Sequence, residues 1–218
     1  QGMGGIGKTE MAVQYAQGYK EQYPSGVCWL SARGAEVGTQ LVNFAVTVLG
    51  LPQPEGELAG QVQSVWNRWP RQDNGERVLL IYDDVTDYGE IEGLLPTDKR
   101  FQVLVTTRLQ NLAAGVDDFR LDLLSEEASL ELFRKIVDEA AGTTRIDDEL
   151  TIAKALCERV GYLPLGLELL GYFLKDKPDT SLARLERQLE QKKLEAQVFK
   201  RAHPGTTAKL GIYEAFEL

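Results

Sequence analysis

Residues 2–9 combine glycine, lysine and threonine in the order G-x-x-x-x-G-K-T. The glycines allow successive backbone N–H groups to point toward a phosphate, because no Cβ atom stands in the way. A helix starting near Gly7 would add unpaired N–H groups and the positive end of its dipole. Lys8 would bring positive charge to the outer phosphates, and the Thr9 hydroxyl can ligate Mg²⁺. The segment therefore predicts a site for a nucleoside triphosphate and Mg²⁺. The expected nucleotide contacts here are Gly2, Gly4, Gly5, Ile6, Gly7, Lys8, Thr9 and Glu10.

The same glycines also satisfy G-x-G-x-x-G, the pattern of dinucleotide-binding folds. That interpretation requires an acidic residue at the end of the next strand, about twenty positions further on. The next strand-like run, residues 26–31, continues into Ala32 and Arg33 without an acid. A lysine–threonine pair is required in a phosphate-binding loop and has no role in a dinucleotide fold, so the first interpretation is favoured.

Two adjacent carboxylates follow a continuous apolar run at residues 78–82. Asp83 is the candidate that serves Mg²⁺ through water, and Asp84 the candidate that orients an attacking water. An aspartate pair that merely initiates a turn is the alternative, and it is common at strand ends. The phosphate-binding loop favours the functional interpretation.

Arg108 follows a second apolar run, residues 101–105, and two threonines. A guanidinium in this position could bind the γ-phosphate through two hydrogen bonds. The alternative is a surface arginine that opens a helix.

The order of the predicted elements indicates an α/β fold, namely a parallel P-loop sheet with helices on both faces. Because ligands bind at the carboxyl ends of parallel strands, Asp83, Asp84 and Arg108 should lie on the same edge as the loop. The expected strands are 26–31, 78–82, 101–105 and 119–123, and the expected helices are 9–23, 40–49 and 58–69.

The pattern changes at Ser125, a good helix N-cap, and only helical periodicity follows. We therefore predict a nucleotide-binding domain over residues 1–124, a helical subdomain over 125–204 and the beginning of another domain over 205–218.

Composition restricts the functional classes. The net charge of −9 over 218 residues argues against binding of a nucleic-acid backbone. No apolar run approaches twenty residues, so no membrane span is expected. Cys28 and Cys157 lie far apart in apolar settings, as expected for reduced core residues of a cytoplasmic protein.

The ordered set of motifs resembles the NB-ARC domain of STAND signalling NTPases over nearly the whole chain. The motifs are GMGGIGKT (2–9), WLS (29–31), LLIYDDV (79–85), VLVTTR (103–108), LLSEEA (123–128) with LF (132–133), and GYLPL (161–165). The resemblance implies an α/β nucleotide-binding domain followed by a helical ARC subdomain. It also implies a strand preceding residue 1 and a winged-helix domain that begins near residue 206.

The family implies a switch that holds ADP at rest, exchanges it for ATP on activation, oligomerises and hydrolyses ATP slowly. By resemblance, Lys8 and Thr9 hold phosphates and Mg²⁺, Asp83 serves the metal and Asp84 serves hydrolysis. Arg108 is then the sensor of the γ-phosphate. Pro164 would pack on the base or ribose, although it could equally be a helix-starting proline. Tyr82 departs from the aliphatic residue more usual at that position.

Other classes remain open at this point. An AAA+ motor or another P-loop ATPase would turn over rapidly, a P-loop kinase would carry a mobile basic lid, and a scaffold would bind nucleotide without hydrolysis. The expected partners are an adenine nucleotide, further copies of the chain, and effector and sensor domains of unidentified type.

Overall fold

The computed structural model describes residues 1–33, 36–73, 75–110, 112–113, 115–139 and 142–202, the last ten by their backbone alone. The chain divides into two compact units, Gln1–Leu121 and Asp122–Leu218. The predicted beginning of a further domain, residues 205–218, lies outside the described residues. The predicted subdomain boundary at residue 124 stays a prediction.

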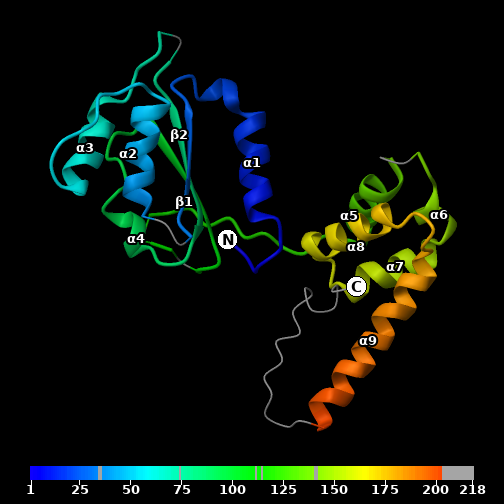
Figure 1. Cartoon of the computed structure of the whole chain (residues 1–218). Coiled ribbons are helices and arrows are strands. Elements are labelled where there is room, and N and C mark those ends of the chain that lie inside the picture. Colours follow the sequence, from blue (N-terminus) through cyan, green and yellow to red (C-terminus); the bar gives the residue numbers. More distant parts are fainter. Residues whose placement is uncertain (34–35, 74, 111, 114, 140–141, 203–218) are drawn as a thin grey trace. The chain divides into compact units, whose positions relative to one another are not determined.

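The first unit is built on a parallel sheet of β1 (Val27–Ser31), β2 (Val78–Val85) and β3 (Phe101–Thr107) in the order β1-β2-β3 (Figure 1). Both pairings are parallel, with Trp29 opposite Ile81 and Ile81 opposite Leu104. The expected α/β architecture is confirmed, and β2 holds the central position among the three strands.

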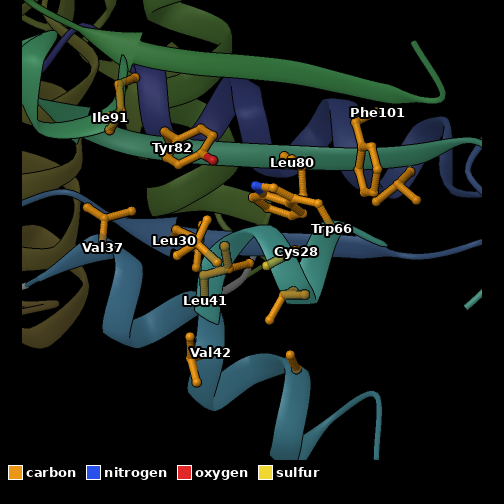
Figure 2. Packing of buried hydrophobic residues seen from close by; sticks show 14 of the residues in the cluster. Cys28, Leu30, Val37, Leu41, Val42, Trp66, Leu80, Tyr82, Ile91 and Phe101 are labelled. Carbon is orange, nitrogen blue, oxygen red and sulfur yellow. The ribbon is translucent and has the colours of Figure 1, made fainter. Parts of the chain in front are cut away.

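Helices cover both faces of β2, as the continuous apolar run at residues 78–82 predicts. Successive side chains of a strand point to opposite faces. Leu80 and Tyr82 pack toward α2 (Val37–Thr47) and α3 (Leu58–Arg68), the cluster shown in Figure 2. Leu79 and Ile81 pack on the other face toward α1 (Lys8–Gly18). All four side chains are at most 1% exposed, and full burial of one such side chain contributes about 1.5–3 kcal/mol. This rigid strand carries the two carboxylates at its end.

The helix predicted over residues 9–23 is shorter in the structure. α1 ends at Gly18, and a 3₁₀ turn, η1 (Lys20–Gln22), follows. Glycine is a poor helix former, and the turn directs Tyr23 back onto the sheet, where its hydroxyl donates to Gln102 Oε1 at 2.7 Å. A short helix, α4 (Gly89–Glu92), lies between β2 and β3 in the sequence.

The strand predicted at residues 119–123 is wrong. The structure assigns no strand to this segment. Among its hydrogen bonds, the Gln1 amine donates to Phe119 O and the Leu121 N–H donates to Gln1 O. A strand ladder requires successive paired residues, and the contacts of one residue do not form one.

The second unit is helical throughout its described part. Its elements are α5 (Glu126–Arg134), a π-helical turn η2 (Lys135–Glu139), α6 (Arg145–Asp148), α7 (Leu150–Arg159), α8 (Pro164–Asp176) and α9 (Leu182–Ala202). Ser125 caps α5 as predicted, since its hydroxyl accepts from the Ala128 N–H at 3.1 Å. The core is aliphatic around Phe133. α8 packs so closely on η2 that a Cβ on Gly171 would lie 2.6 Å from Ile136 Cγ2.

Within the ranges described above, every helix is too short or too polar to cross a bilayer.

Candidate nucleotide-binding site

The glycine-rich segment forms a tight turn leading into α1. Gly5 and Gly7 adopt positive φ angles of 75° and 92°, which residues with a Cβ rarely adopt. The first intrahelical bond runs from Met11 N–H to Gly7 O at 2.8 Å. The N–H groups of the first turn have no helical partner and remain available to an anion.

Lys8 lies across this turn. Its ammonium donates to Gly2 O and Met3 O, each at 2.9 Å. An ammonium has three protons, so one can still reach a phosphate oxygen. Burial lowers the pKa of Lys8, the neighbouring Arg108 lowers it further, and the Asp84 and Asp83 carboxylates oppose this shift.

Asp83 joins the loop to the sheet. Its Oδ1 accepts hydrogen bonds from the Thr9 hydroxyl at 2.8 Å and from the Thr106 hydroxyl at 2.6 Å. Because the Thr9 proton points to the carboxylate, the oxygen lone pairs are free to face a cation. Asp83 Oδ2 can accept from water bound to that cation.

This donor set fits Mg²⁺. That ion is usually bound by one or two carboxylates together with substrate phosphates and water, and not by a cage of protein ligands. The described residues contain no group of three or more His, Cys, Asp or Glu side chains that could hold a metal. Thr9 and Asp83 would hold Mg²⁺, which would neutralise charge on the phosphate oxygens.

Asp84 occupies a β-bulge. The register passes from Tyr82 opposite Val105 to Val85 opposite Thr107, so two residues of β2 face one residue of β3. Asp84 itself has a φ of 56°, unusual for a residue with a side chain.

Two arginines flank the Asp84 carboxylate. Arg33 lies 3.6 Å from Oδ2 and Arg108 lies 3.9 Å from Oδ1. Arg108 also lies beside the loop, because a Cβ built on Gly4 would be 4.0 Å from its Cζ. A guanidinium in this place can face both a carboxylate and a nucleotide phosphate.

The structure thus brings together Lys8, Thr9, Asp83, Asp84 and Arg108, at the edge where the sequence predicts them. Their roles toward a nucleotide remain predictions.

Three further residues predicted to contact the nucleotide, Ile6, Glu10 and Pro164, are not part of this group of charged and hydroxyl side chains. Ile6 is buried beneath the turn at 7% exposure, and exposed Glu10 accepts a hydrogen bond from Gln14 Nε2 at 2.7 Å. Pro164 begins α8 in the second unit, as the helix-starting interpretation predicts. Its contact with a nucleotide stays a prediction.

Thr106 and Arg33 were not among the residues predicted from the sequence. Thr106 belongs to the Thr-Thr-Arg segment, where only the arginine suggested phosphate chemistry. Arg33 follows the end of β1, and the shared edge of parallel strands is the signal that could have identified it.

Comparison with known proteins gives the same identification. The profile of the NB-ARC domain family matches residues 1–142. The chain is 31% identical over 179 residues to the regulatory protein AfsR of Streptomyces griseus, covering 77% of the chain and 17% of AfsR. It is 27% identical over 197 residues to a probable disease resistance protein of Arabidopsis thaliana, covering 79% of the chain and 21% of that protein. It is also 29% identical over 212 residues to apoptotic protease-activating factor 1 of Danio rerio, covering 88% of the chain and 16% of that protein. The chain therefore spans about a fifth or less of the length of these relatives, and it belongs to the NB-ARC family of STAND nucleotide-binding signalling proteins.

Proposed function

We propose that this chain is an adenine-nucleotide switch, with ADP bound in the resting state and ATP bound in the active state. The observation that supports it best is the contact between the loop and the acidic end of β2. The Thr9 hydroxyl donates to Asp83 across 74 positions of sequence, and this contact supports the proposal that the two residues hold Mg²⁺ beside the phosphate-binding turn.

Different residues bind the phosphates, hold Mg²⁺ and orient the attacking water. Lys8 and the N–H groups of the first turn of α1 bind the phosphates, and Thr9 and Asp83 hold Mg²⁺. Arg108 binds the γ-phosphate, which ATP has and ADP lacks. Asp84 orients a water that attacks the γ-phosphorus, which yields ADP and inorganic phosphate.

The energy of such a switch requires several of these groups together. To change the ratio of active to resting molecules from 1:99 to 99:1, a nucleotide must bind the active state about 5.5 kcal/mol more tightly than the resting state. One hydrogen bond to a charged group contributes roughly 1.5–3 kcal/mol. Arg108 alone is therefore insufficient, whereas Arg108, Lys8 and Mg²⁺ acting together on one γ-phosphate can reach the required difference.

The remaining parts of the proposal concern the whole protein. Pro164 would pack on the base or ribose, and this contact would couple the bound nucleotide to the orientation of the helical subdomain. The ATP-bound form would self-associate in the cytoplasm, and hydrolysis would be slow. The names of the relatives, a regulator, a disease resistance protein and an apoptotic activating factor, support a signalling role in place of a metabolic one.

Turnover separates this proposal from its competitors. We expect the purified protein to retain ADP through gel filtration and to hydrolyse ATP at well below one turnover per second, against a typical enzyme value of about 10 per second. Rapid turnover without retained ADP would favour a motor ATPase. Binding of ATP with no hydrolysis, and no effect of Asp84→Asn, would favour a scaffold.

A further inference from the structure

We propose that Thr106 is a positioning residue that couples the metal-binding carboxylate of Asp83 to the backbone of Asp84. This inference rests on the proposed function, since it assigns a role in the binding of Mg²⁺ and nucleotide. It concerns a side chain whose hydroxyl contacts Asp83 and the backbone of Asp84.

The Thr106 hydroxyl uses both of its hydrogen-bonding capacities inside the site. It donates to Asp83 Oδ1 at 2.6 Å and accepts from the Asp84 N–H at 2.9 Å. The residue is 5% exposed. Together with the Thr9 bond, these contacts form a continuous chain from the loop, through Asp83 and Thr106, to the backbone of Asp84.

The β-bulge explains why a side chain is needed here. Asp83 and Asp84 face Thr106 alone on β3, so the regular ladder is interrupted at this point. The Thr106 hydroxyl replaces the missing backbone acceptor for the Asp84 N–H. It thereby supports the left-handed conformation of Asp84, which directs that carboxylate toward Arg33 and Arg108.

Binding of a cation by Asp83 would consequently affect the position of Asp84 through the Thr106 hydroxyl. A carboxylate held by two donors is fixed in orientation, whereas one held by Thr9 alone can rotate about its terminal bond. Loss of the hydroxyl should therefore weaken the contribution of Mg²⁺ to nucleotide binding and also misplace Asp84.

Thr107 provides a matched control. It is 3% exposed, and its hydroxyl also makes two hydrogen bonds, donating to Val85 O at 2.7 Å and accepting from Leu109 N–H at 3.0 Å. Both of its partners are backbone groups, so Thr107→Val removes equivalent bonds without touching a carboxylate.

The test measures ATP affinity of the purified protein by calorimetry, with Mg²⁺ and with EDTA, and measures kcat in parallel. In Thr106→Val we expect the gain in affinity due to Mg²⁺ to fall roughly tenfold or more, the size expected for one hydrogen bond to a charged group. The affinity in EDTA should stay within twofold of the parent, which also reports that the variant is folded. Thr106→Ser should restore the parental values, and Thr107→Val should keep them.

A parental Mg²⁺ gain in Thr106→Val, or an equal loss in Thr107→Val, would overturn the proposal. If the valine variant does not fold, Thr106→Ala is held to the same criteria. An absence of ATP and ADP binding in the parent is a different result, and it would refute the proposed function itself.

Discussion

Replacing Arg108 by glutamine should separate ATP binding from ADP binding. The guanidinium lies beside Gly4 of the phosphate-binding turn and 3.9 Å from Asp84 Oδ1, and its side chain is 59% exposed. From this position beside the turn, the Arg108 guanidinium can contact the outermost phosphate of a bound nucleotide. Glutamine keeps most of the stem and removes the charge.

The size of the effect follows from these contacts. One charge-assisted hydrogen bond to the γ-phosphate contributes roughly 1.5–3 kcal/mol, which corresponds to an affinity loss of about 10- to 150-fold for ATP. ADP has no γ-phosphate, so its affinity should stay within about twofold. The exposed ion pair with Asp84 contributes at most about 1 kcal/mol to folding, and the melting temperature should change little.

Calorimetric titration with ADP and with a slowly hydrolysed ATP analogue, both with Mg²⁺, measures the two affinities. Arg71→Gln is the matched control, because Arg71 has the same 59% exposure and pairs with Glu76 at 2.8 Å, away from the site. An unchanged ratio of ATP to ADP affinity in Arg108→Gln, or an equal loss for both nucleotides, would refute the sensor role.

Two further predictions concern the loop and the core. Gly7→Ala places a Cβ on a residue with a φ of 92°, so it should cost about 1–2 kcal/mol and weaken ADP binding; Gly18→Ala, in open space within α1, should be neutral or stabilising in thermal melts. Burial raises the pKa of the Cys28 thiol from 9.0 to about 12. The unfolded chain therefore releases this proton first as pH rises, and the free energy of unfolding should fall from about pH 9 toward pH 12. Urea titrations should show a shallower fall in Cys28→Ala, and an identical slope would contradict the assignment.

The sheet was largely predictable from the sequence, because a parallel strand buried on both faces leaves an unmistakable pattern. The apolar run at residues 78–82 gave the central strand of the three, and its end gave the position of Asp83 and Asp84. The limits of α1 were not predictable to the same degree. Helical periodicity continues past Gly18, and the packing of Tyr23 against the sheet, which the sequence does not reveal, adds to the poor helix propensity of glycine in ending the helix there.

The inner arrangement of the site depends on register, which the sequence does not reveal. A threonine near the end of a strand is ordinary, since β-branched residues favour strands. Thr106 gains its significance only because the bulge sets it opposite both Asp83 and Asp84. Arg33, by contrast, approaches Asp84 because β1 and β2 end at the same edge, a placement that follows from the parallel sheet.

Calorimetric titration of the purified protein with ADP and Mg²⁺, after removal of any retained nucleotide, measures whether this chain binds an adenine nucleotide. We predict saturable binding of one ADP per chain, abolished in Lys8→Ala although that variant keeps the parental circular dichroism spectrum. A folded protein that releases no heat with either ADP or ATP, or a Lys8→Ala variant that binds as tightly as the parent, would contradict the account.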